Sequence, residues 1–101
     1  MQPARALVFD PDPAIQALVW GVLADAGFAV GVEIDGSAVG LVVADVEEMA
    51  VAEAVSGDAT LVLFVGASGV PPILDSRRAF LAKPFSRDEL CAEIARLVGN
   101  G

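Results

Sequence analysis

The sequence has no histidine and only one cysteine, Cys91. Without histidine the chain lacks the commonest general base and the commonest ligand for transition metals. Any bound metal would therefore be a hard cation held by carboxylate oxygens. A single cysteine excludes a disulfide bond within the chain and fits a reducing compartment, so we expect a cytoplasmic protein.

Basic residues and long apolar runs are also scarce. Six lysines and arginines stand against 14 acidic residues, which gives a formal net charge of −8. Such a surface would repel a phosphate backbone, so we do not expect nucleic acid as a direct ligand. No apolar run approaches the roughly 20 residues of a membrane-spanning helix, and the opening MQPARALVFD does not resemble a secretory signal. We expect a protein that binds neither nucleic acid nor a membrane.

Apolar residues are plentiful enough for one hydrophobic core. The 101 residues suit a single domain over residues 1–101, and 55% of them are hydrophobic. Five short apolar runs stand out, and four of them are continuous rather than alternating, which is typical of parallel strands covered on both faces. The five predicted strands are 6–9, 29–34, 41–44, 60–65 and 79–82.

Local signals predict three helices between and after these strands. Asp12 can cap the first helix, Pro13 suits its first turn, and Trp20 falls beside its apolar stripe, where we expect it to flank the core. Ser86 and Glu89 have the spacing of a capping box at the start of the last helix. The predicted helices cover residues 13–26, 47–55 and 86–98, and residues 70–78 hold at most a short fourth one.

One connection is too short for a regular alternation of strands and helices. Only six residues, Asp35 to Gly40, join the second strand to the third. A crossover helix needs a connection of about ten to twelve residues or more. Either an extended loop makes the return, or the second strand pairs differently through a turn at Asp35 and Gly36. The predicted fold is α/β, with a five-stranded, mostly parallel sheet that lacks its second helix.

Charged residues follow three of the predicted strands. Asp10 and Asp12 come after the first strand, Asp45 ends the third, and Lys83 ends the fifth. In an open parallel sheet, ligand sites form beyond these carboxyl ends. Carboxylates there can hold a divalent cation, an aspartate can accept a phosphoryl group, and a lysine can neutralise phosphate. Taken singly, the aspartates could be helix caps and the lysine a surface charge.

Three segments carry these residues: LVFDPDPAIQAL, LVVAD and FLAKPFSRDEL. They resemble the landmark segments of response-regulator receiver domains (CheY-like), and the resemblance runs from about residue 4 to residue 98. It implies a flavodoxin-like, five-stranded parallel fold. It also implies that Asp10 and Asp45 contribute to a metal site, that Asp45 is the phosphoacceptor, that Lys83 contacts the phosphate, and that Phe80 is the aromatic switch residue.

The sequence departs from the family pattern at two positions that matter for phosphorylation. Pro11 stands where the family has a second acid that binds the metal directly, and Gly66 stands where it has a serine or threonine that follows the phosphate. Both changes should weaken Mg²⁺ binding and switching. We therefore expect a non-enzymatic signalling module of a two-component system or phosphorelay, with weakened or lost phosphorylation. The resemblance implies a histidine kinase, a phosphotransfer protein or another signalling protein as its partner.

Two other functions fit parts of the sequence. LVFDPDP also resembles the nucleophile motif of haloacid-dehalogenase-like phosphatases, in which Asp10 would be the nucleophile and Asp12 the acid and base. Alternatively, the chain is purely a structural dimerisation module. Loss of the second helix should uncover a sheet patch that favours a homodimer. Its candidate residues are Val30, Val32, Leu41 and Val43.

Overall fold

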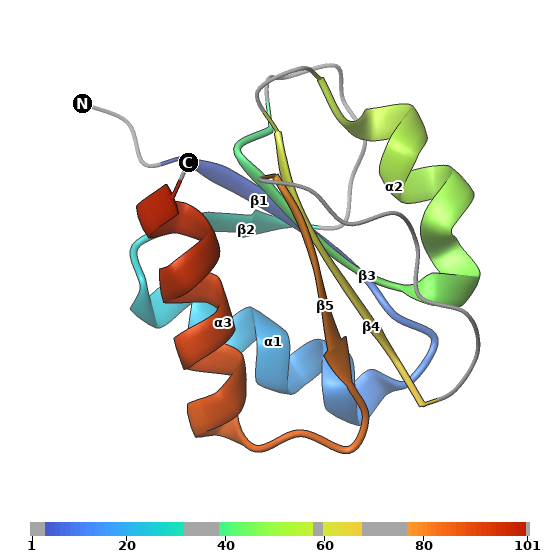
Figure 1. Cartoon of the computed structure of the whole chain (residues 1–101), viewed down its shortest axis with the longest axis vertical. Helices are drawn as coiled ribbons and strands as arrows, with labels where there is room; N and C mark the ends of the chain where they lie inside the picture. Colours follow the sequence, from blue (N-terminus) through green and yellow to red (C-terminus); the bar gives the residue numbers. More distant parts are fainter. Residues whose placement is uncertain (1–3, 32–38, 58–59, 68–76, 101) are drawn as a thin grey trace.

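The computed structural model describes residues 4–31, 39–57, 60–67 and 77–100. Within them the strands form one sheet, and the helices pack around it (Figure 1). The strands are β1 (Arg5–Phe9), β2 (Ala29–Gly31), β3 (Leu41–Asp45), β4 (Leu61–Gly66) and β5 (Arg78–Ala82). The helices are α1 (Pro13–Asp25), the 3₁₀ turn η1 (Val46–Glu48), α2 (Met49–Val55) and α3 (Arg87–Asn100).

The five strands form one sheet in the order β2-β1-β3-β4-β5, and every neighbouring pair is parallel. The prediction of a five-stranded parallel sheet is confirmed. β2 pairs in parallel with β1 and is not a neighbour of β3, so these two strands do not form a hairpin. The path of residues 32–38 lies outside the described residues. The strand order reverses between β1 and β3, which places their carboxyl ends at the crevice where open α/β sheets bind ligands.

Helices cover the sheet in two layers. α1 and α3 pack beside each other on one face, and α2 lies on the other face (Figure 1). Val43 and Leu63 point into the α1–α3 layer, whereas their neighbours Val42 and Phe64 point toward α2. All four side chains are buried, as the continuous apolar runs predict for strands covered on both sides. The prediction that the first and last helices share a face is confirmed.

The two long helices begin where capping side chains predict. Asp12 Oδ1 accepts a hydrogen bond from Ala14 N at 2.9 Å, which satisfies a free N–H group in the first turn of α1. Ser86 and Glu89 exchange the two bonds of a capping box before α3, at 3.0 and 3.1 Å. Gly27, with φ +96°, follows α1 in a conformation that suits glycine. In the described part of the chain, no helix is long and apolar enough to cross a membrane.

The predicted helix over 47–55 is only partly α-helical. Residues Val46–Glu48 form the 3₁₀ turn η1, and α2 begins at Met49. Asp45 Oδ1 accepts a hydrogen bond from Glu47 N at 2.9 Å, and this cap holds the tight turn directly after β3. The segment predicted to hold at most a short helix, 70–78, lies outside the described residues up to residue 76.

The prediction of an exposed sheet patch near the short second connection is wrong for Leu41 and Val43. Leu41 is fully buried and Val43 is 1% exposed, because both side chains face the α1–α3 layer. Val30 is partly buried against the same layer, and Val32 lies outside the described residues. Leu41 and Val43 therefore do not contribute to the homodimer surface that the missing helix suggested.

Candidate functional site

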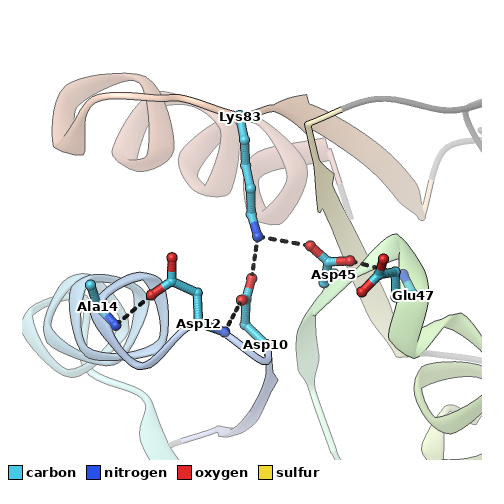
Figure 2. Close-up of polar contacts among 6 residues, drawn as sticks. All are labelled: Asp10, Asp12, Ala14, Asp45, Glu47 and Lys83. Atoms are coloured by element: carbon cyan, nitrogen blue, oxygen red, sulfur yellow. Dashed lines mark hydrogen bonds and ion pairs between the residues drawn. The ribbon is translucent and has the colours of Figure 1, made fainter.

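Asp10, Asp45 and Lys83 meet at the carboxyl edge of the sheet, as their positions after three strands predict (Figure 2). Asp10 follows β1, Asp45 is the last residue of β3, and Lys83 follows β5. The Lys83 side chain reaches in between the two carboxylates. Its Nζ lies 2.9 Å from Asp10 Oδ2 and 2.7 Å from Asp45 Oδ2.

Backbone contacts hold each member of this group in place. Asp10 Oδ1 accepts a hydrogen bond from Asp12 N at 2.8 Å, and Asp45 Oδ1 accepts one from Glu47 N at 2.9 Å. In each carboxylate, one oxygen therefore accepts a hydrogen bond from the turn after its strand, and the other oxygen contacts Lys83. The amide of Lys83 donates to Gly66 O at 2.8 Å, which extends the pairing of β5 with β4 to the base of the lysine side chain.

Asp12 does not join this group. Its carboxylate caps α1 through Ala14 N, and the residue is exposed (Figure 2). The interpretation of Asp12 as a helix cap is confirmed. Asp88 and Glu89, which lie in the first turn of α3, are exposed as well. Glu89 is used in the capping box, so it is not directed at Lys83.

The group is largely shielded from water. The side chains of Asp10, Asp45 and Lys83 are 2%, 9% and 16% exposed. Asp10 Oδ2 is fully buried, and among the described residues it accepts no well-directed hydrogen bond. Its ion pair with Lys83 therefore offsets the cost of burying this oxygen. An unpaired buried carboxylate would be costly, which makes Lys83 necessary to the two acids.

The charges of Lys83 and Asp45 stabilise each other. Burial disfavours the charged form of both side chains, but this effect is outweighed in each. The hydrogen bond from Lys83, followed by the bond from the Glu47 amide, holds the pKa of Asp45 below its ordinary value. The hydrogen bond to Asp45, the close contact with Asp10 and the Coulomb attraction of both carboxylates raise the pKa of Lys83. Both side chains are therefore ionised at neutral pH.

The donors at this site do not fit a resident Mg²⁺ ion. Mg²⁺ requires near-octahedral oxygen ligands, and Pro11 contributes no side-chain oxygen. The ammonium group of Lys83 already lies against the free oxygen of each carboxylate. Over the described ranges, no three acidic or cysteine side chains are grouped so that they could hold a metal ion. A cation at this edge would have to displace Lys83.

The tip of β4 shows why no hydroxyl-bearing residue stands there. A Cβ atom on Gly66 would lie 2.9 Å from Val46 Cγ2, closer than real contacts allow, and 3.6 Å from Phe80 Cε1. Val46 therefore fills the space beside Gly66. Phe80 is partly buried and packs against the core cluster beneath α2. Sequence reasoning missed Val46, because an apolar residue after a strand carries no signal of the residue it will face.

Comparisons with known proteins agree on the fold. No protein-family model matches the chain, and no curated protein matches it. Solved structures do match. A response regulator receiver domain protein from Bacillus halodurans has a TM-score of 0.73 and 19% identity, over 95% of this chain and 97% of that chain. The chemotaxis response regulator CheY4 of Vibrio cholerae has a TM-score of 0.72 and 20% identity, over 95% of this chain and 99% of that chain.

A longer protein contains a similar structure as one part. Full-length FixJ from B. japonicum matches with a TM-score of 0.64 and 23% identity, over 98% of this chain but 59% of that chain. The identities of these matches are low, so what they establish is the architecture. The chain has the fold of response regulator receiver domains, one parallel sheet between two helical layers.

Proposed function

We propose that this chain is a receiver-like signalling module of a two-component system or related phosphorelay, and that it acts by binding a protein partner rather than by catalysis. The partner would be a histidine kinase, a phosphotransfer protein or another signalling protein. Support comes from the fold, which the chain shares with response regulator receiver domains. We take residues 1–101 as one receiver-like domain, and the single cysteine keeps a cytoplasmic location as our expectation.

One observation carries the proposal of weakened phosphorylation: Lys83 pairs with both Asp10 and Asp45, and among the described residues no further acid joins them to form a metal-binding group. In this proposal Asp45 is the phosphoacceptor, Lys83 is the phosphate partner, and Phe80 stands at the switch position. Asp10 and Asp45 are the acids that would face a metal ion. The same contacts that support these roles also oppose the reaction.

The charges at the site explain why these contacts oppose phosphorylation of Asp45. The two carboxylates carry two negative charges and the ammonium group carries one positive charge, so the group already has a net charge of about −1. A phosphoryl group on Asp45 would replace one negative charge by about two. Lys83 would then face the phosphate and the buried Asp10 carboxylate alone. Without a tightly bound divalent cation, the acyl phosphate would form slowly and would be poorly stabilised, so we propose that Mg²⁺ binds weakly at most.

Incubation with acetyl phosphate and Mg²⁺, followed by intact mass spectrometry, tests the proposal. We expect little phosphorylated species in the wild type and none in Asp45→Asn. Asp12→Asn is the matched control, and it should show the same small amount of phosphorylated protein as the wild type. Rapid, nearly complete labelling would contradict weakened phosphorylation. Label that survives in Asp45→Asn, or that requires Asp10, would instead favour the phosphatase-like chemistry in which Asp10 is the nucleophile.

A further inference from the structure

A groove runs between α1 and α3, which lie side by side on one face of the sheet (Figure 1). Its volume is about 320 Å³, which falls in the range of small-molecule sites. A cavity of about 150 Å³ is large enough to bind benzene, so this groove can hold a compound of two rings. Asp10, Asp45 and Lys83 do not line it. The groove is therefore separate from the candidate site at the carboxyl edge.

Most of the groove is lined by apolar side chains. Val22 and Ile94 form its buried part, and Phe28 is partly buried beside them. Val98 also lines the groove, and it is 42% exposed. Trp20, the other large apolar side chain open to solvent among the described residues, does not line it. An apolar ligand in the groove would remove this surface from water, which favours binding.

The groove has one pair of opposite charges, Asp25 on α1 and Arg87 on α3. Their side chains are 71% and 51% exposed, so both remain open to solvent. Over the described ranges, the hydrogen bond from Arg87 Nη2 to Asp25 Oδ2 is the one found for either side chain. A guanidinium group has five N–H donors and a carboxylate has two acceptor oxygens. The pair can therefore bind a further polar group while it stays intact.

The charge balance of this pair selects the ligand. An anionic head group would meet Asp25 and a chain with a net charge of −8, whereas a cationic head group would meet Arg87. A neutral hydroxyl or amide group can accept a hydrogen bond from Arg87 and donate one to Asp25. We propose that the groove between α1 and α3 binds a small, neutral, apolar molecule that carries one hydroxyl or amide group. The site would give the chain an input that does not pass through Asp45.

Cys91 provides the measurement, because it lines the groove, is exposed and is the single cysteine of the chain. Three probes share a naphthalene ring: neutral 2-naphthol, anionic 2-naphthoate and cationic (2-naphthylmethyl)trimethylammonium. We expect about 1 mM 2-naphthol to slow the labelling of Cys91 by N-ethylmaleimide about fivefold, and each charged probe to slow it less than about twofold. Intact mass spectrometry measures the rates. No protection by 2-naphthol, or equal protection by all three probes, would overturn the proposal.

Two alanine variants test where the probe binds. Ala95→Leu enlarges a side chain that lines the groove and should abolish the protection of Cys91 by 2-naphthol. Ala54→Leu, at an exposed position of α2 on the other face of the sheet, is the matched control and should keep it. Protection is the ratio of the labelling rates without and with 2-naphthol in the same variant, so a change in basal reactivity cancels. Protection that persists in Ala95→Leu, or that is lost in both variants, would overturn the assignment.

Arg87→Met tests the preference for a neutral head group. The variant leaves Asp25 without its partner, so the cationic probe should now protect Cys91 about threefold better than 2-naphthol does. The fold should be little affected, because an exposed ion pair contributes little stability. An order of probes unchanged from the wild type would overturn the role of the Asp25–Arg87 pair. None of these measurements involves Asp45, so their outcome is independent of the acetyl phosphate experiment.

Discussion

Lys83 determines the charge balance at the candidate site, because its ammonium group is shared by two buried carboxylates. The side chains of both aspartates are almost entirely removed from water, so burying them without this partner would be costly. The neighbouring residue Pro11 is exposed and adds no oxygen to this arrangement. At the scale of single residues, a lysine thus stands in the position that a cation would need, and a proline limits the number of ligands.

Pro11→Asp tests this account of the site. A third carboxylate next to Asp10 should let Mg²⁺ compete with Lys83, and we expect its affinity to rise by about tenfold or more. Calorimetric titration with MgCl₂ measures the change, with Pro11→Ala as a control for the loss of the proline ring. Tight, stoichiometric binding in the wild type would show that the donors already present suffice. An affinity unaltered by Pro11→Asp would mean that residue 11 does not face the site.

At the scale of elements, the end of β4 and the turn after β3 fit together as one packed unit. Val46, the first residue of η1, fills the space above Gly66, the last residue of β4. Asp45 caps η1 while its other oxygen contacts Lys83, so the turn that places Val46 also places the phosphoacceptor candidate. We infer that the absence of a side chain at Gly66 and the presence of Val46 depend on each other, because Val46 occupies the space that a Cβ atom at position 66 would need.

Gly66→Ser should therefore destabilise the fold. The new Cβ would lie 2.9 Å from Val46 Cγ2, and relieving this overlap should lower the free energy of unfolding by about 1–3 kcal/mol. Urea denaturation measures the loss. Val46→Ala in the same chain should recover much of it, and the coupling can be obtained from the four proteins of a double-mutant cycle. Additive effects of the two substitutions would contradict this packing.

At the scale of the whole molecule, stability should depend on pH through the shared lysine. The pKa of Asp45 lies below its ordinary value of 3.8, so its contribution is present above pH 3.8 and is lost as the pH falls through the lowered pKa. The pKa of Lys83 lies above its ordinary value of 10.5, so its contribution is complete below pH 10.5 and is lost as the pH rises through the raised pKa. Both groups therefore stabilise the fold across the neutral range.

Lys83→Met should lower the free energy of unfolding at pH 7 by about 3 kcal/mol, because it leaves two buried carboxylates facing each other. The deficit should shrink as the pH falls toward the acidic range, since one of the two acids then takes up a proton. Urea denaturation at several pH values measures both effects. Arg96→Met, which removes an exposed ion pair with Glu93, should cost much less at every pH. Comparable losses in the two variants would contradict a central role for Lys83.

The sequence was sufficient to predict much of the fold and part of the site. Continuous apolar runs predict strands buried on both faces, and the Asp12 and Ser86 signals place the starts of α1 and α3 correctly. Sequence reasoning failed at Leu41 and Val43, because a continuous apolar run does not reveal which side chains face which layer. Residues 32–38, where the short connection runs, lie outside the described residues.

The sequence by itself determined that Asp10, Asp45 and Lys83 would meet, because the carboxyl ends of parallel strands collect at one edge of a sheet. Only the tertiary structure decided how they meet. That Lys83 lies between the two carboxylates, and that Val46 fills the space beside Gly66, depends on distances between side chains from separate strands. Those distances follow from strand order and register, and an apolar run that continues over both faces of a strand leaves the register open, because it lacks the alternation that distinguishes the two faces.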